Sequence, residues 1–350
     1  MKIQNVMKNQ NSKLIAALVI MASFFTTSCS DDDSGNNNDS NQTVSLFASN
    51  NSNGNITVYD VTSNQNIMSR TLITTSTAAD GVFYNKETES VFQASRSGNN
   101  LEGFLNVDGL VNGAAINVDV AGTSDMMSPR EVAVNGNFFV VADNADVDGD
   151  TNTPDGRLFI YSMSNGSFSL RNVITTNFKL WGITFNGNDL YAVVDATNEL
   201  AIFTNFLSNT STTTLSASKR IVIEGIVRTH GITYDTSSDV LVMTDIALAT
   251  NGQDDGGFHI IENFTNKLNA TANGGTLGLS NQTRVSGNST LLGNPVDVAY
   301  DATTQTVYIA EAGNGGGRIL AFNNIGSGGN LTPFFNSALA SASSVYLSNN

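Results

Sequence analysis

The chain has 350 residues, of which 40% are hydrophobic and 13% are charged, about half the ~25% charged fraction usual in soluble domains. Long surface helices laced with Glu–Lys pairs are therefore not expected. Its 16 basic and 31 acidic residues give a net charge of −15, which disfavours a nucleic-acid partner because it repels phosphate, and its single cysteine excludes a disulfide framework and a thiolate zinc cluster.

Residues 1–28 have the pattern of a bacterial signal peptide. Three lysines precede an apolar run over residues 14–25, which is shorter than the ~20 residues needed to span a bilayer. Small residues then lead to Cys29, and this junction resembles a bacterial lipobox, although Thr26 stands where that motif usually has Leu. The resemblance implies a lipid on Cys29 that anchors the protein to the membrane. The alternative is a plain secretory signal with an incidental cysteine.

Residues 29–42 are predicted to be a disordered acidic tether, because residues 30–42 contain no apolar side chain that could join a core. Asp31, Asp32 and Asp33 resemble the acidic tag that sends some bacterial lipoproteins to the outer face of the outer membrane. The resemblance implies an outer-membrane lipoprotein displayed at the cell surface.

Beyond the tether, six segments repeat one pattern, a turn-like entry followed by an apolar strand. They begin about 50 residues apart, at Ala79, Pro129, Leu180, Thr229, Pro295 and Ala342. The first five are each followed by a tight turn and a second strand, and Asn135-Gly136 and Asn186-Gly187 are strong hairpin signals. Three or four strands in every repeat of this length are typical of propeller blades.

The two ends of this region complete one another. The last repeat has a single strand, over residues 345–347, whereas residues 46–50 and 56–59 look like a second and third strand that lack a first. Joining them closes the ring and removes exposed strand edges. We therefore predict an all-β fold over residues 43–350, a six-bladed β-propeller whose first blade is closed by the C-terminal strand.

The repeat also resembles a known family. Residues 295–301, followed by residues 307–311 and 318–322, are similar to an NHL repeat, and residues 129–135 with 139–143 repeat the likeness. The resemblance covers residues 43–350 and implies a propeller. It does not imply one activity, because NHL-like propellers include binding modules as well as lactonases.

One face of the predicted ring gathers the polar residues. The loop that enters each inner strand and the end of each second strand lie on the same face, which we call the entry face. The predicted ligand-binding residues on it are Arg130, Glu131, Asp143, Trp181, Asp195, His230, Asp245, Asp297 and Glu311. Acids held close together need a cation, an arginine or solvent to compensate their charge. The alternative is that the acids at strand ends only cap turns.

A calcium loop is predicted directly after Asp143. The ligand positions 1, 3, 5, 7, 9 and 12 of a calcium loop are matched by Asn144, Asp146, Asp148, Asp150, Asn152 and Asp155, with Gly149 at the sharp turn. The loop departs from the EF-hand at its first and last ligands and has no flanking helices. The alternative is a solvated acidic loop.

Two residues at the channel mouth have two interpretations each. His230 could be a general base or a hydrogen-bonded packing residue, and Trp181 could stack on a sugar or plug the channel.

Two classes of function follow. The favoured one is a non-catalytic surface module that binds a glycan, a peptide or a protein. The alternative is a metal-dependent hydrolase that resembles gluconolactonase-type lactonases, with a channel calcium as Lewis acid. That resemblance implies metal ligands at the inner-strand entries, where only Asp80, Glu131 and Asp297 could serve, and these belong to blades that are not all adjacent. Catalytic candidates are His230, Glu131 and Asp297.

Overall fold

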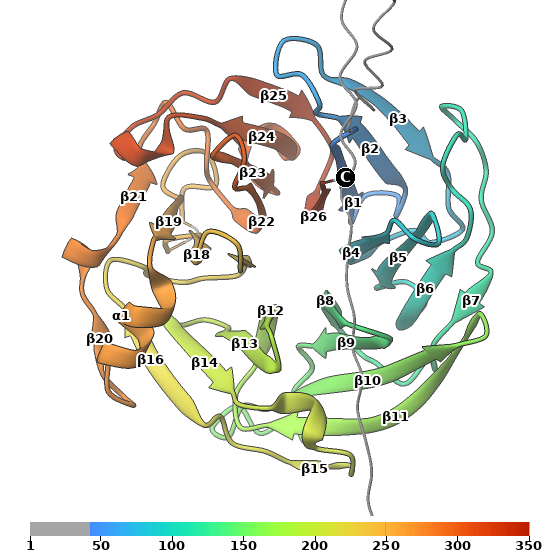
Figure 1. The fold of residues 1–350 in the computed structure, drawn as a ribbon, viewed down its shortest axis with the longest axis horizontal. Coiled ribbons are helices and arrows are strands. Elements are labelled where there is room, and N and C mark those ends of the chain that lie inside the picture. The colour runs from blue at the N-terminus through green and yellow to red at the C-terminus, as the bar shows by residue number, and fades with distance from the viewer. Residues whose placement is uncertain (1–42, 249, 350) are drawn as a thin grey trace, which may run out of the picture. The chain divides into compact units, whose positions relative to one another are not determined.

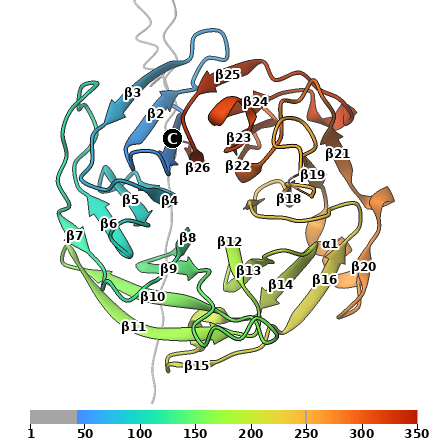
Figure 2. The same cartoon turned by 180° about the vertical axis from the view of Figure 1, so that it is seen from behind.

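The computed structural model describes residues 43–248 and 250–349. Six sheets surround a central axis, and the inner strand of each sheet lines the axis (Figure 1). Their strands pair antiparallel, except for two short outer strands that pair parallel. The same closed ring is seen from behind in Figure 2. The predicted six-bladed β-propeller is therefore confirmed. The signal peptide, the lipidation of Cys29 and the tether lie outside the described residues.

The strands follow the chain blade by blade. Blade 1 contains β26 (Ala342–Ser348), β1 (Ser45–Asn50), β2 (Ile56–Asp60) and β3 (Met68–Leu72). Blade 2 contains β4 (Ala79–Asn85), β5 (Ser90–Ser95), β6 (Asn100–Phe104) and β7 (Val120–Ala121). Blade 3 contains β8 (Pro129–Asn135), β9 (Phe138–Asp143), β10 (Gly156–Ser164), β11 (Ser167–Thr176) and the short β15 (Thr213–Thr214).

The second half of the ring has the same plan. Blade 4 contains β12 (Leu180–Asn186), β13 (Asp189–Val194), β14 (Glu199–Phe203), β16 (Lys219–Ile223) and the short β20 (Thr276–Leu277). Blade 5 contains β17 (Ile232–Asp235), β18 (Val240–Asp245), β19 (Gly257–Ile261) and β21 (Thr283–Ser286). Blade 6 contains β22 (Pro295–Asp301), β23 (Thr306–Glu311), β24 (Arg318–Phe322) and β25 (Phe335–Ala338).

Helices are few and short. The α-helix α1 spans Phe264–Ala270, and single 3-10 turns occur at Phe206–Ser208, Leu279–Asn281, Asn314–Gly316 and Ile325–Ser327. Within the described ranges, no helix is long and apolar enough to cross a membrane.

The C-terminal strand closes the ring as predicted. β26 pairs antiparallel with β1, with Ser348 opposite Ser45 and Val345 opposite Ala48. The C-terminus therefore completes the blade that the N-terminal strands begin (Figure 1). This pairing occupies a strand edge of β1 that would otherwise be exposed.

The hairpin turns differ in detail from the prediction. Asn135 pairs with Phe138 and Asn186 with Asp189, so each turn is centred on the glycine and the residue after it. Gly136 and Gly187 have φ angles of 59° and 57°, and they alone take positive φ in these turns. This pattern, with glycine first, matches a type II′ turn rather than type I′, which needs positive φ at both central residues.

The core lies between the blades. Six hydrophobic clusters each join two neighbouring blades, so both faces of the sheets are buried. In β13, Leu190, Ala192 and Val194 pack towards blade 3. Tyr191 and Val193 alternate with them and pack towards blade 5. The period of two along a strand thus feeds two interfaces at once.

Candidate functional site

The inner strands are bulged where they begin. The register shifts near the first residues of β4, β8, β12 and β22, and the pairing of β26 with β1 shifts at the equivalent place. A bulge changes the direction of side chains at the rim of a sheet. The shifts coincide with the predicted site residues Asp80, Arg130, Glu131 and Trp181.

Close contacts between neighbouring inner strands narrow the central channel on the entry side. A Cβ on Gly182 would lie 2.5 Å from the carbonyl oxygen of His230, and a Cβ on Gly231 would lie 2.6 Å from the Cα of Asp297. The N–H of Gly182 also donates a hydrogen bond to the carbonyl oxygen of His230, at 2.9 Å. Glycine therefore allows the inner strands of blades 4, 5 and 6 to approach one another.

A stack of three side chains lies on the entry side. The rings of Trp181 and His230 are parallel within 5°, with centroids 3.6 Å apart, and the guanidinium carbon of Arg130 lies 3.9 Å from the Trp181 ring centroid. At these distances, His230 and Arg130 must lie on opposite faces of the indole. Trp181 therefore has no free ring face on which a sugar could stack.

Two acids fix this stack. Asp80 accepts hydrogen bonds from Arg130, at 2.8 Å, and from the side chain of Asn51. Asp195 accepts one from Nε2 of His230, at 3.2 Å, and a second from Arg228, at 3.1 Å. Burial lowers the pKa of His230, although the contact with Asp195 acts in the opposite direction. Because of this burial, the imidazole is neutral at pH 7.

The other acids at the second-strand ends hold loops within the protein. Each of the three carboxylates is completely buried. Asp143 accepts from the backbone N–H of Ser128 and forms an ion pair with Arg157. Asp245 accepts three backbone N–H groups and Glu311 accepts four. Their geometry is that of turn caps, and a ligand role for them stays a prediction.

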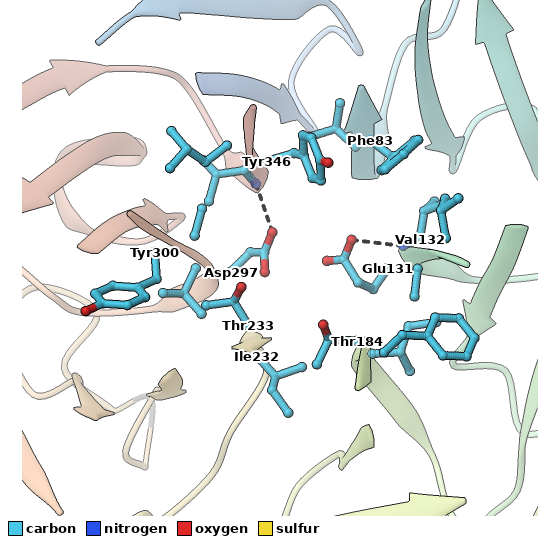
Figure 3. A pocket seen from close by; sticks show the side chains of 18 residues that line it. Phe83, Glu131, Val132, Thr184, Ile232, Thr233, Asp297, Tyr300 and Tyr346 are labelled. Carbon is cyan, nitrogen blue, oxygen red and sulfur yellow. Dashed lines mark hydrogen bonds between the residues drawn. The ribbon is translucent and has the colours of Figure 1, made fainter. Parts of the chain in front are cut away.

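Glu131 and Asp297 meet on the axis. They come from blades 3 and 6, which lie opposite one another in the ring, and their carboxyl groups face each other within hydrogen-bonding reach (Figure 3). Glu131 Oε1 accepts from the N–H of Val132, at 2.9 Å. Asp297 Oδ2 accepts from the hydroxyl of Ser344, at 2.7 Å, and from the N–H of Val345, at 2.8 Å. Asp297 therefore also holds the closing strand β26.

Burial and mutual repulsion disfavour two charges in this pair. Burial raises the pKa of Glu131 well above its usual value, and the neighbouring Asp297 raises it further. Burial also raises the pKa of Asp297 to about 7, against the hydrogen bonds from Val345 and Ser344. Near neutral pH, the pair therefore holds a proton.

A cavity of about 230 Å³ extends from this pair along the axis. Its walls run from Glu131 to Val134 on β8 and from Asp297 to Tyr300 on β22, so it leads towards the ends of the inner strands. That side, where the hairpins between the first and second strands lie, is called the hairpin face. The side chains of the Arg130 stack do not line the cavity.

A wider groove continues from the cavity on the hairpin face. The groove has a volume of about 770 Å³ and lies beside the first hairpins of blades 2 and 3. It shares four lining residues with the cavity: Phe83, Val134, Tyr346 and Leu347. The carboxylate pair is thus reached from the face opposite to the one that the sequence pattern indicates.

The predicted calcium loop brings three of its six residues together. One carboxylate oxygen from each of Asp146, Asp148 and Asp155 lies within 4.8 Å of the others. Oδ2 of Asp146 is buried and accepts no hydrogen bond, while Lys179 lies 3.9 Å away.

The other three residues of the loop have different partners. Asn144 donates its side-chain N–H to Asp195 and to the carbonyl oxygen of Leu180. Asp150 accepts from the backbone and side chain of Asn152. Only the three acids Asp146, Asp148 and Asp155 are therefore arranged around one point.

Comparison with known proteins shows the fold alone. No protein-family model and no curated protein sequence matches the chain. A chain in the crystal structure of a nidogen/laminin complex is 12% identical, with a TM-score of 0.56, over 87% of this chain and 98% of that chain. A "putative 6-phosphogluconolactonase" from Bacteroides uniformis is 12% identical, with a TM-score of 0.50, over 87% and 84%. A protein of unknown function from Bacteroides caccae is 10% identical, with a TM-score of 0.50, over 87% and 98%.

The sequence pattern did not reveal which candidates meet. It placed Glu131 and Asp297 in blades that are not adjacent, yet opposite blades are the ones whose side chains can touch across an axis. It also missed Thr184 and Thr233, whose hydroxyl groups point towards the pair in Figure 3. Their position two residues after an inner glycine was the only available signal.

Proposed function

We propose that the protein is a non-catalytic, ligand-binding β-propeller whose site is the axial cavity. The observation that supports this proposal is the cavity itself, which ends on the carboxyl groups of the buried Asp297 and the half-buried Glu131. Its lining contains no histidine, cysteine, serine or lysine, so the commonest enzyme nucleophiles and the commonest general base are missing from it. His230 lies outside it, packed on Trp181 and hydrogen-bonded to Asp195. A small ligand that enters from the hairpin face would meet polar groups only at the inner end.

The location is proposed from the N-terminal pattern. We propose that Cys29 carries a lipid, that residues 30–42 separate the propeller from the outer membrane, and that Asp31–Asp33 favour display at the cell surface. A surface site would meet extracellular glycans, peptides or proteins. The negative net charge disfavours anionic ligands such as nucleic acids.

Calcium is proposed as a structural ion of the acidic loop. The three acids fit a hard cation, because they offer carboxylate oxygens around one point and one of these, Asp146 Oδ2, is buried without a hydrogen bond. Asp146, Asp148 and Asp155 would hold the ion. Bound there, it would neutralise the acids and fix the loop that follows Asp143. It would take no part in chemistry at the axis.

A lactonase-like hydrolase is the second candidate. The facing carboxyl groups of Glu131 and Asp297 favour it, because one protonated and one ionised carboxyl can act as an acid–base pair. The propeller named as a "putative 6-phosphogluconolactonase" has the same fold. A channel metal fits less well: within the described ranges, the only group of three or more metal-ligating side chains is the one in the acidic loop.

Lactone hydrolysis distinguishes the two proposals. The proton released from δ-gluconolactone would be followed at constant pH, with and without calcium, for the wild type and for Glu131→Gln. Asp125→Asn removes the same charge on the exposed loop before β8 and serves as the matched control. We expect no rate above spontaneous hydrolysis in any sample. Turnover that is lost in Glu131→Gln but kept in Asp125→Asn would overturn the non-catalytic proposal.

A further inference from the structure

The carboxyl pair has no cationic partner in its cavity. None of the 18 lining residues is a lysine, arginine or histidine. The residue that precedes Glu131 in the sequence, Arg130, is basic. Its guanidinium group, however, is bound to Asp80 and covers Trp181 on the entry side. A proton or an external cation is therefore needed to offset the negative charge of Glu131 and Asp297.

The acceptors at the inner end of the cavity are few and close together. The hydrogen bond from Val132 ends on Oε1 of Glu131, and those from Ser344 and Val345 end on Oδ2 of Asp297. The second oxygen of each carboxyl group receives none of these bonds. The hydroxyl groups of Thr184 and Thr233 point towards the same place (Figure 3). The free oxygen of each carboxyl group and the two threonine hydroxyl groups thus face the same end of the cavity.

The rest of the cavity is apolar and aromatic. Phe83, Phe185, Tyr300 and Tyr346 line it together with aliphatic side chains, and the Phe83 and Tyr346 rings meet edge to face at 4.9 Å. Such walls suit a hydrocarbon chain, and aromatic rings also attract cations. The volume of about 230 Å³ lies below the range of drug-sized sites and fits a small ligand.

We propose that this cavity binds the primary ammonium group of a small aliphatic amine, with its three N–H donors on Glu131, Asp297 and a threonine hydroxyl. The alkyl chain then lies along the aromatic walls towards the hairpin face. This inference rests on the proposed function, because it takes the cavity to be the ligand site. An ammonium group has three donors and no acceptor, which matches the carboxylate and hydroxyl oxygens at the inner end of the cavity.

The same acceptors and apolar walls disfavour other ligands. Calcium takes six to eight oxygen ligands, and within the described ranges only the acidic loop brings three or more metal-ligating side chains together. A neutral sugar would leave the charge of the pair uncompensated and would meet mainly apolar walls. A quaternary ammonium group has the charge but no N–H donors, so it could not donate hydrogen bonds to the carboxylates.

Amine binding is measured on the whole propeller with n-pentylamine as the probe. Calorimetric titration at pH 8 gives the affinity, and the fluorescence of Trp181, the only tryptophan, reports on the neighbouring stack. 1-Pentanol has the same length without the charge, and tetramethylammonium has the charge without the donors. We expect n-pentylamine to bind at least about tenfold more tightly than either control.

Two substitutions locate the site. Glu131→Gln keeps the size and removes one carboxylate, and we expect it to weaken n-pentylamine about tenfold or more. Thr184→Val removes one acceptor without changing the charge, and a weakening of about threefold is expected. Asp125→Asn, on the exposed loop before β8, should bind as the wild type does. Thermal melting of each variant shows that it is folded.

Affinity should also increase between pH 5 and pH 8, because Asp297, which has a pKa of about 7, then loses its proton to solvent. The other charged group that acts on Glu131 is Asp80, and the pKa of Tyr300 and Tyr346 is raised by burial, so both phenols stay protonated over this range.

The wild type alone can overturn the inference. Equal binding of n-pentylamine and 1-pentanol, or no binding of n-pentylamine, would refute an ammonium site even if Glu131→Gln failed to fold. Calcium that displaced n-pentylamine, and was itself lost in Glu131→Gln, would refute it in favour of a channel metal. Lactone turnover is a separate result: it would refute the non-catalytic function, whereas failure of amine binding without turnover refutes only the ligand class.

Discussion

Replacing Asp297 with asparagine is expected to make the propeller more stable at pH 8 than the wild type. The carboxyl group is 3% exposed and faces Glu131 across the axis. Asparagine has nearly the same shape and cannot ionise. Its side-chain oxygen can still accept from Ser344 and Val345, and its N–H can donate to Glu131. The substitution therefore removes a buried charge and keeps the contacts of β26.

The sign and size of the expected change in stability follow from the raised pKa of Asp297. Asp297 has a pKa of about 7 in the folded protein, against ~3.9 when unfolded. The folded state therefore holds a proton that the unfolded state releases. This contribution is complete below about pH 4 and is lost as the pH rises to about 7. Three pKa units correspond to about 4 kcal/mol, which is the upper limit of the gain expected at pH 8.

Urea unfolding at pH 4.5, 6, 7 and 8 measures the effect. The difference between Asp297→Asn and the wild type should be below ~1 kcal/mol at pH 4.5 and should increase with pH, as the buried Asp297 of the wild type becomes ionised. An Asp297→Asn variant that is equally destabilised at every pH would refute the reasoning. It would mean that Asp297 is ionised and holds β26 as an anion.

Three further predictions concern closure, calcium and location. Deleting residues 342–350 removes β26 and bares an edge of β1, so the melting temperature should fall by ~10 °C or more, and a truncated protein that melts as before would contradict the shared closure. Calcium should raise the melting temperature of the wild type by about 5 °C at saturation. Asp148→Ala should abolish this shift and Asp150→Ala should keep it, whereas equal shifts in all three proteins would remove the loop site. Cys29→Ala should release the protein from membrane fractions, and unchanged fractionation would contradict lipidation.

The architecture was predictable because its determinants are local and repeated. Each repeat carries its own apolar strands, and residues 46–59 and 345–347 supplied the missing parts of one blade. The structure has these strands at the expected places and pairs β26 with β1. In a propeller, the hydrophobic core of each blade is shared with its two neighbours. A period in the sequence is therefore sufficient to predict the ring.

The site depended on contacts that no period encodes. The pattern grouped Asp143, Asp245 and Glu311 with the axial acids, yet their carboxylates hold backbone N–H groups of nearby loops. Glu131 and Asp297 are 166 residues apart and meet because closure places blade 3 opposite blade 6. Which residue sits at a strand entry could be read from the sequence. Which carboxylates bind backbone, which face a cavity and on which side that cavity opens depend on bulges and on packing across the axis, and these exist only in the closed ring.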